Sequence, residues 1–284
     1  MSELLDFFQL ALVKATPLIF AALAGVICER SGILNIALEG GLTVGAFTGA
    51  AVSFETGNPL LGLVAGMLAG ALLCGLLGVA ATRFGVDQIV AGIGLNMLAA
   101  GATAFAVVVL FGAPGATPEV HALGSAGETA LIAVAVVAAL ALQLGFDRTP
   151  WGLRLRACGE NPQAVLSAGL DPRRIRVLAT LAGGAIAGLG GVFLSLGELD
   201  LYSDGMTAGR GFIALAAVIF GRWTPLGAAG AALAFGALSA LQFVLQRSGV
   251  PSELMQALPY LAALAALTGI VGKARAPAAD GVPL

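Results

Sequence analysis

Long stretches without a single charged residue constrain the fold of this chain more than any other feature of its sequence. These uncharged runs cover 15–28, 40–54, 56–82, 88–118, 129–146, 177–197, 223–246 and 254–272. A helix that crosses the ~30 Å hydrocarbon core of a membrane needs about 20 predominantly apolar residues. Charged residues make up only 11% of the chain, whereas soluble domains carry roughly 25%. The sequence therefore predicts a polytopic membrane protein and excludes a soluble domain.

The runs predict an all-α fold: a helical bundle of 8–10 transmembrane helices, with nine as the preferred count, in a single transmembrane domain over residues 1–284. The predicted helices cover 7–28, 32–54, 59–82, 87–112, 128–146, 177–197, 208–221, 224–246 and 253–271. Segment 208–221 is short, so we expect it to be re-entrant or tilted. Glu3 and Asp6 precede the first basic residue, Lys14. A signal peptide begins with a positively charged region, so we expect the first helix to be retained.

The basic residues predict the orientation of the bundle, because cytoplasmic loops carry an excess of Lys and Arg. With nine crossings and a cytoplasmic C-terminus, Lys14, Arg210 and Arg247 are the three of the 14 basic residues that lie outside. The opposite orientation would place the other 11 on the wrong side. We therefore predict a bacterial inner-membrane protein with an external N-terminus and a short cytoplasmic tail, residues 272–284.

Glycine spacing indicates how the predicted helices pack. Gly62, Gly66 and Gly70 recur every four residues, and so do Gly184 and Gly188. Residues four apart share one helix face, and small residues let helices in a membrane approach closely. We expect these glycines to serve tight helix packing only.

Nothing in the sequence indicates an enzyme. Neither Lys14 nor Lys273 follows a glycine-rich phosphate loop, and His121, the single histidine, lies in a predicted external loop. The three cysteines have no metal-ligand or redox spacing, and we expect them to pack as small apolar residues; they are Cys28, Cys74 and Cys158. We therefore expect no catalytic residue, no metal and no cofactor bound by this chain.

The charged segment 147–176 contains six arginines and two turn signals. Between these signals, residues 162–168 are predicted to form a short helix, because Asn161 is a suitable N-cap and Pro162 suits the first helical position. Gly169 is a suitable stop after the last turn. The segment is predicted to be either a short amphipathic helix on the cytoplasmic face or a plain loop that only sets orientation.

Five stretches resemble one family of transport proteins, in order and over nearly the whole chain. They are ERSGILNIALEGGLTVGAF at 29–47, GVDQIVAGIGLNMLAAG at 85–101, RACGENPQAVLSAGLDPRRIR at 156–176, LAGGAIAGLGGVFLSLG at 181–197 and GRGFIALAAVIFGRWTPLGAAGAALAFG at 209–236. The chain resembles ABC-importer permeases of the ribose and branched-chain amino-acid class, and within it the sub-group associated with nucleoside uptake.

This resemblance implies a division of labour among subunits. The permease pairs with a second permease subunit, either a paralogue or another copy, and an ATPase with two nucleotide-binding halves uses ATP-Mg in the cytoplasm. An extracytoplasmic binding protein delivers the substrate. We therefore expect these proteins and membrane lipid as partners, and no nucleic acid. The positions that the resemblance assigns to ATPase coupling are Arg156, Gly159, Glu160, Asn161, Pro162, Ala164 and Gly169.

Polar residues inside predicted membrane helices are candidates for a substrate path, because they are costly in lipid unless they face the bundle interior. Asn35 and Glu39 are four residues apart on one predicted helix face, and Gln88 and Asn96 share a face of another helix. These side chains could hydrogen-bond a nucleoside or sugar, or could instead bond across helices as structural links. An outer loop holds the residues that we assign to an external gate: Asp200, Tyr202, Asp204 and Arg210.

The leading hypothesis is a permease subunit of an ATP-driven importer for nucleosides or related simple sugars. One alternative is an ion-coupled secondary transporter of a small polar solute, in which Glu39 would bind the coupling ion. The other alternative is a membrane-embedded regulatory or scaffold protein that transports nothing. The identity of the substrate is left open at this point.

Overall fold

The structure, a computed structural model, describes residues 2–245 and 275–282, and the fold within these residues is helical. The described part contains no β-strand beyond one isolated antiparallel bridge between Ala116 and Ser203. Its elements are α1 (Ser2–Arg30), α2 (Leu38–Thr56), α3 (Pro59–Arg83), α4 (Gln88–Phe111), α5 (Gly124–Arg148), α6 (Pro150–Glu160), α7 (Pro162–Ser167), α8 (Pro172–Val192), the π-helical turn η1 (Phe193–Glu198), α9 (Arg210–Phe220) and α10 (Pro225–Leu245).

Six of the described helical segments are long and apolar enough to cross a membrane. They are Leu4–Arg30, Pro59–Arg83, Gln88–Phe111, Gly124–Arg148, Pro172–Glu198 and Pro225–Val244. The all-helical membrane fold is thus confirmed, whereas the predicted count of nine crossings is not. Segment 208–221 is a short apolar helix, as expected, and predicted helix 253–271 lies outside the described residues.

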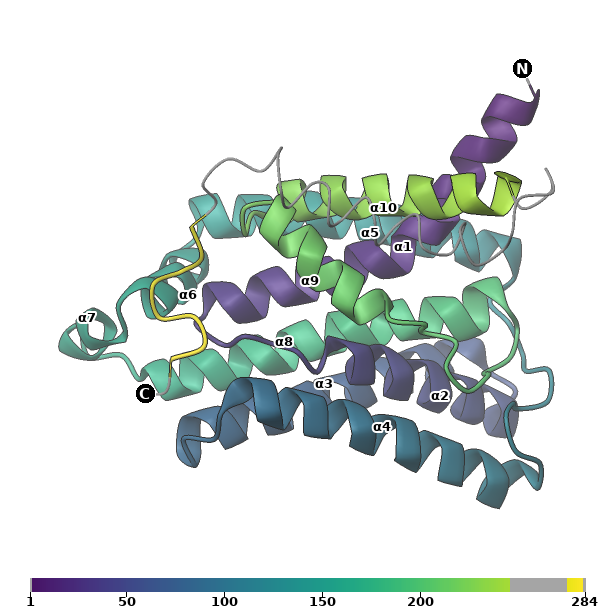
Figure 1. The fold of residues 1–284 in the computed structure, drawn as a ribbon, viewed down its shortest axis with the longest axis horizontal. Coiled ribbons are helices and arrows are strands. Elements are labelled where there is room, and N and C mark those ends of the chain that lie inside the picture. Colours follow the sequence, from purple (N-terminus) through teal and green to yellow (C-terminus); the bar gives the residue numbers. More distant parts are fainter. Residues whose placement is uncertain (1, 246–274, 283–284) are drawn as a thin grey trace.

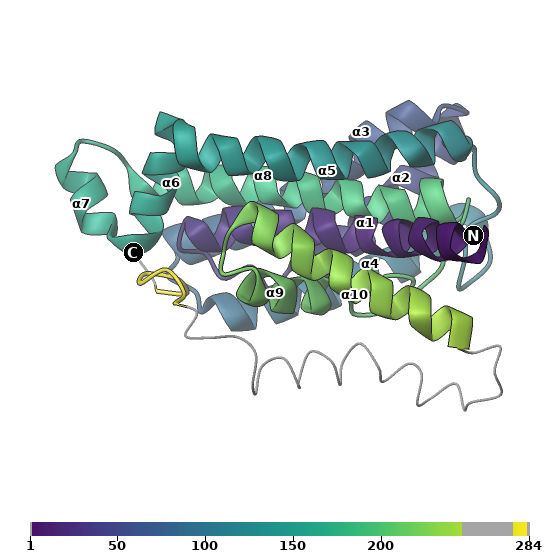
Figure 2. The same cartoon turned by 90° about the horizontal axis from the view of Figure 1, so that it is seen from above.

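Helices α1 and α8 run through the middle of the bundle and are mostly buried, whereas α4 and α5 are mostly exposed. Figure 1 shows α2, α3 and α4 on one side of this central pair and α5 and α10 on the other. Figure 2 shows that α6 and α7 lie beyond one end of the long helices, with α7 projecting furthest. The N-terminus lies at the opposite end of α1 from the C-terminal tail, described over residues 275–282.

Four predicted helix starts differ from the structure by four residues or more. The helices predicted over 7–28 and 128–146 begin earlier, at Ser2 and Gly124. The helix predicted over 32–54 begins at Leu38, because residues 31–37 form a non-helical link, named here the α1–α2 link. The helix predicted over 177–197 begins at Pro172, where the Asp171 side chain accepts a hydrogen bond from the Arg173 backbone N–H at 2.9 Å and so caps α8.

The glycine pattern packs as predicted. A Cβ atom on Gly70 would lie 2.4 Å from the backbone oxygen of Gly184, and one on Gly188 would lie 2.3 Å from that of Gly66. One turn before Gly66 on the same face of α3, a Cβ on Gly62 would lie 2.5 Å from the backbone oxygen of Gly49 in α2. Only glycine allows these backbones to approach so closely, and these contacts hold α2, α3 and α8 together.

Candidate functional site

A polar cavity of about 410 Å³ lies between α2, α4 and the loop from η1 to α9, named here the η1–α9 loop (residues 199–209). Its polar lining consists of Glu39, Thr43, Asn96, Tyr202, Asp204 and Thr207. Two separate predictions meet here, because Glu39 and Asn96 belong to the predicted substrate path and Tyr202 and Asp204 to the predicted external gate. The fold brings these four side chains to one cavity.

The polar cavity extends along the length of the bundle. Asn96 lies eight residues after the first residue of α4, a helix of 24 residues. With a rise of 1.5 Å per residue, this places Asn96 about 12 Å along a helix about 36 Å long. Asp204 marks the other end, since its backbone N–H donates to the Gly115 carbonyl beyond the end of α4. The cavity thus extends from one end of the bundle toward its middle.

Glu39 holds the start of α9 against α2. Its Oε1 accepts a hydrogen bond from the Gly209 backbone N–H at 2.8 Å, and its Oε2 accepts one from the Gly211 N–H at 2.6 Å. The first N–H groups of a helix have no partner within the helix and carry a partial positive charge. A carboxylate at that place satisfies them. Gly211 is required here, because a Cβ on it would lie 2.4 Å from the Glu39 backbone nitrogen.

Asn96 and Gln88 both form hydrogen bonds with the backbone of the α1–α2 link, and Asn96 also bonds the start of α2. Asn96 Nδ2 donates to the Ile36 carbonyl at 2.9 Å, and its Oδ1 accepts from the Gly40 N–H at 2.7 Å. Gln88 Oε1 accepts from the Leu34 N–H at 2.7 Å. Both residues therefore bond across helices, and only Asn96 also lines the polar cavity.

Asn35 does not share a helix face with Glu39, because it lies in the non-helical α1–α2 link. Its side chain is fully buried, and its Nδ2 donates to Cys28 Sγ at 3.3 Å. The Asn35 Oδ1 atom has no partner among the described residues. The expectation that Asn35 and Glu39 lie on one helix face is therefore wrong.

The four predicted gate residues have different surroundings. Tyr202 is buried, and its hydroxyl donates to Thr103 Oγ1 at 3.0 Å, which ties the η1–α9 loop to α4. Arg210 folds back and donates to the Met206 carbonyl at 2.6 Å. Neither Arg210 nor Asp200 lines the polar cavity.

The predicted coupling segment forms two helices instead of one. Helix α7 is the short predicted helix: Asn161 Oδ1 accepts from the Ala164 N–H at 3.1 Å, and Pro162 occupies the first turn. Gly169 follows with φ +77°, a left-handed conformation that favours glycine. Helix α6 carries Arg156, Gly159 and Glu160. The two helices meet at Asn161.

The end of α6 contacts the end of α1 and the C-terminal tail. A Cβ on Gly159 would lie 2.3 Å from the backbone oxygen of Arg30. Arg30 Nη1 lies 3.9 Å from Glu160 Oε1, and Glu160 Oε2 accepts from the Ala278 N–H at 3.3 Å. The Gly159 carbonyl accepts from the Ala279 N–H at 2.8 Å. Two of the predicted coupling residues therefore hold the C-terminal tail.

Arg176 connects the C-terminal tail to the α1–α2 link. Its side chain is buried, and the guanidinium donates to the Ser31 carbonyl at 3.1 Å, the Val282 carbonyl at 2.8 Å and the Ala279 carbonyl at 3.1 Å. Burial raises the pKa of the nearby Asp280 carboxyl to about 7, although the positive charge of Arg176 partly opposes this shift.

The sequence analysis did not predict several of these features. The sequence did contain a signal for the start of helix α6, because Thr149 is its N-cap and Pro150 lies in its first turn. No sequence signal distinguishes Arg176, because it is one of six arginines in a basic segment. The indole N–H of Trp223 donates to the buried carboxylate of Glu29, a pair that no spacing in the sequence links.

The cysteines and the single histidine are the remaining residues with a predicted environment. All three cysteines are buried and free, as expected for packing residues, and His121 is exposed in a non-helical stretch. Among the described residues, no group of three or more His, Cys, Asp or Glu side chains is placed to hold a metal ion.

Comparison with known proteins identifies relatives of this chain among transport proteins. The chain is 39% identical to the guanosine ABC transporter permease protein NupQ of Bacillus subtilis, over 96% of this chain and 94% of NupQ. It is 35% identical to the nucleoside ABC transporter permease protein NupC of Lactococcus lactis, over 95% of this chain and 94% of NupC. A second B. subtilis relative, the guanosine ABC transporter permease protein NupP, is 30% identical over 85% of this chain and 75% of NupP.

No solved structure matches the chain. The family model for the branched-chain amino acid transport system permease component matches residues 8–267. A match over this length, together with relatives that align along nearly the whole chain, is decisive for the family. The chain belongs to the branched-chain amino acid transport system permease component family, and it is a membrane-spanning permease subunit.

Proposed function

We propose that this permease subunit carries nucleosides through the membrane in an ATP-driven importer, and that the polar cavity is part of the substrate path. The cavity itself is the observation that carries this proposal. It offers a carboxylate, an amide and several hydroxyl groups, and a nucleoside presents hydroxyls and ring nitrogens that such groups can hydrogen-bond. Its volume of about 410 Å³ falls in the range of about 300–1,000 Å³ typical of small-molecule sites. The names of NupQ and NupC support the same substrate class.

A second permease subunit would complete the path. The polar cavity opens beside Ala100 of α4, which is exposed, and its lining includes Glu39 and Asn96, which are only partly buried within the bundle. Polar groups at membrane depth do not face lipid without a large cost, so another protein surface is needed there. We favour a paralogue over a second copy, because B. subtilis has two different relatives of this chain, NupQ and NupP, both named guanosine permeases.

Coupling to ATP hydrolysis is assigned to α6 and α7, where a cytoplasmic ATPase with two nucleotide-binding halves would dock. Helix α7 projects beyond the bundle at the end where the C-terminal tail lies (Figure 2). Ten arginines lie at or beside this end: Arg30, Arg83, Arg148, Arg154, Arg156, Arg173, Arg174, Arg176, Arg222 and Arg275. By the positive-inside rule, this distribution supports a cytoplasmic position for this end, with the N-terminus and the docking face for a binding protein outside.

The test is uptake of radiolabelled guanosine by a bacterial strain that lacks nucleoside uptake and expresses this chain with its second permease, ATPase and binding protein. We expect uptake that vanadate abolishes and that an uncoupler leaves unchanged. Uptake that only the uncoupler abolishes would instead show an ion-coupled transporter, an alternative that the family match does not favour. Preference for a simple sugar over guanosine would overturn the substrate. A chain that moves no solute and co-purifies with no ATPase would be a scaffold protein.

The coupling role has its own test. Replacing Glu160 or Gly169 with Trp should leave ATP hydrolysis active while uptake falls, because each change disturbs the junction between α7 and the bundle. The matched control is Glu55→Trp, at an exposed position near the opposite end of the bundle. Wild-type uptake by both α6–α7 variants would contradict this role.

A further inference from the structure

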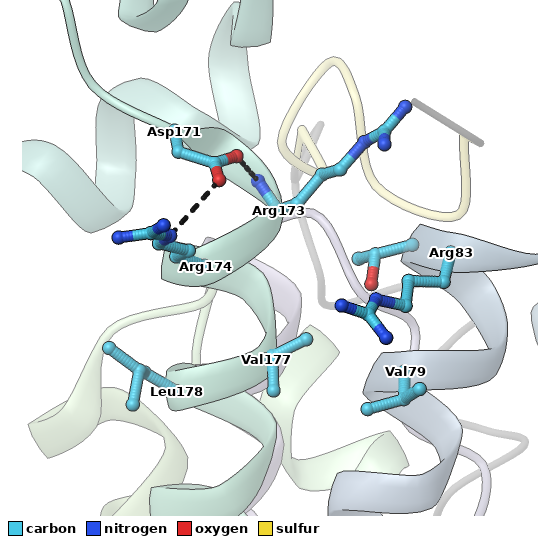
Figure 3. Close-up of a pocket in the computed structure, with 8 residues that line it drawn as sticks. Val79, Arg83, Asp171, Arg173, Arg174, Val177 and Leu178 are labelled. Carbon is cyan, nitrogen blue, oxygen red and sulfur yellow. Dashed lines mark hydrogen bonds and ion pairs between the residues drawn. The ribbon is translucent and has the colours of Figure 1, made fainter.

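A second cavity, named here the basic cavity, lies between α3 and α8 at the end of the bundle that carries α6 and α7 (Figure 3). Its volume is about 530 Å³. It is separate from the polar cavity and shares no residue with it. Its walls are formed by Val79, Thr82, Arg83, Asp171, Arg173, Arg174, Val177 and Leu178. The proposed transport function leaves this cavity unexplained.

The charges of the basic cavity do not balance. Its lining holds three guanidinium groups and one carboxylate. The carboxylate of Asp171 already caps α8 and pairs with Arg174, whose Nε lies 3.4 Å from Asp171 Oδ2. Arg83 and Arg173 form no ion pair with any residue of 2–245 or 275–282. Figure 3 shows the Arg83 side chain reaching from α3 toward α8, whereas the Arg173 side chain extends upward from α8 toward the C-terminal tail. The cavity thus presents a net positive charge of two.

The lower part of the basic cavity is apolar. Val79 of α3 and Val177 and Leu178 of α8 form this part, below the arginines (Figure 3). Leu178 is 64% exposed, and Phe84, next to Arg83, is 75% exposed. Exposed large apolar side chains at the end of membrane-spanning helices face lipid. This exposure is consistent with a cavity that opens sideways toward the bilayer at the ends of α3 and α8.

The helix contacts explain why a space remains at this place. Glycines keep α3 and α8 together over most of their length, with Gly70 against Gly184 and Gly66 against Gly188. The close contact continues to Gly78, where a Cβ would lie 2.0 Å from Thr180 Oγ1. Past Gly78 the two helices bear side chains in place of glycine, and Val79 and Val177 line the space between them. The same two helices that pack most tightly in the middle of the bundle therefore leave a basic cavity at their ends.

We propose that the basic cavity binds the phosphate group of an anionic phospholipid, with an acyl chain along its apolar wall. Guanidinium groups bind phosphate oxygens through paired, charge-assisted hydrogen bonds. Basic pockets between membrane helices on the cytoplasmic side are suited to anionic headgroups. The apolar wall and the opening toward the bilayer favour a lipid over a free phosphate ion, which would gain nothing from Val177 or Leu178.

The test uses the complete transporter purified in mild detergent, with phosphatidylglycerol and phosphatidylcholine of identical acyl chains as probes. Native mass spectrometry measures how much of each lipid stays bound at increasing lipid concentration. We expect the double variant Arg83→Gln/Arg173→Gln to bind phosphatidylglycerol about 30-fold more weakly and phosphatidylcholine as before, from the usual contribution of a basic residue near an anionic membrane surface.

The matched control is Arg148→Gln/Arg154→Gln, which removes two exposed arginines near the same end but outside the cavity. This variant should retain phosphatidylglycerol. Val177→Trp fills the cavity without changing any charge, and it should also lose the lipid. If the Arg83→Gln/Arg173→Gln variant does not assemble, lipid binding by Val177→Trp provides the test of the proposal. Equal binding by all variants, or equal loss in both double variants, would overturn the proposal. Binding of inorganic phosphate that Val177→Trp leaves intact would show a free-anion site instead, and a partner permease cross-linked through Arg83→Cys would show a protein contact.

Discussion

Replacing Glu39 with Gln tests whether the carboxylate holds α9 in place. Both carboxylate oxygens accept backbone N–H groups, from Gly209 at 2.8 Å and from Gly211 at 2.6 Å. A glutamine has one oxygen and one NH₂ group, so it can accept one of these N–H groups and must present a donor to the other. The substitution keeps the size of the side chain and removes only its charge and one acceptor.

The expected cost follows from these two contacts. A hydrogen bond to a charged group contributes about 1.5–3 kcal/mol. The attraction between a negative charge and the start of a helix adds about 0.3–1 kcal/mol. Glu39→Gln loses one such bond and this attraction, and thus about 2–4 kcal/mol. We expect the variant to unfold at a lower temperature than the wild type and to transport less guanosine, because α9 and the η1–α9 loop lose their anchor.

The assay is thermal unfolding of the purified transporter, paired with guanosine uptake at a temperature where both proteins are folded. Glu55→Gln, an exposed carboxylate near the other end of α2, is the matched control and should change neither. An unchanged unfolding temperature for Glu39→Gln would refute the anchoring role. If uptake alone is lost, Glu39 acts on the substrate path without holding the fold.

Two further changes have defined outcomes. Gly211→Ala places a Cβ 2.4 Å from the Glu39 backbone nitrogen, so it should lower the unfolding temperature. The control is Gly101→Ala, whose Cβ meets nothing within 4 Å and which should be neutral or stabilising by up to about 1 kcal/mol. Equal effects of the two variants on the unfolding temperature would contradict the contact between Gly211 and Glu39. Because burial raises the pKa of Asp280 to about 7, from 3.8, the docked tail binds a proton that the free tail has released, so docking should weaken as the pH rises from about 4 to about 7. Carboxypeptidase should therefore remove the tail faster at pH 8 than at pH 5.5. Asp280→Asn should abolish this difference between the two pH values. Arg176 cannot cause the difference, because it is charged at both.

Local signals predicted the parts of the fold that local chemistry determines. Asn161 and Pro162 indicated α7 correctly, because a cap and a proline in the first turn act within a few residues of the helix start. The four-residue spacing of Gly66 and Gly70 in α3, and of Gly184 and Gly188 in α8, indicated close packing, because residues four apart share one helix face. These features depend on neighbours in the sequence, so they can be read without a structure.

The break before α2 could not be predicted in this way. Residues 32–37 are mostly apolar and compatible with a helix. They stay non-helical in a fold where Gln88 and Asn96 of α4 satisfy the backbone of the link. The polar cavity depends on the same kind of contact, because Tyr202 reaches it only after the η1–α9 loop turns inward along α4. Such features arise from pairs of residues that no spacing in the sequence connects.

Arg176 links the two ends of the proposed mechanism. Its guanidinium joins the C-terminal tail, through the Val282 carbonyl, to Ser31 at the start of the α1–α2 link, and this link leads directly to Glu39. Arg176→Gln cannot reach all of these carbonyls and leaves buried acceptors unpaired, at a cost of about 1–3 kcal/mol for each. If movement of α6 and α7 reaches the polar cavity through this connection, the variant should hydrolyse more ATP per guanosine transported, beyond any loss of stability. Asn96 bonds the same link without touching the tail. Asn96→Asp cannot donate to the Ile36 carbonyl, so it should change uptake and unfolding temperature together. An unchanged ratio of ATP hydrolysed to guanosine transported in Arg176→Gln would limit Arg176 to holding the fold.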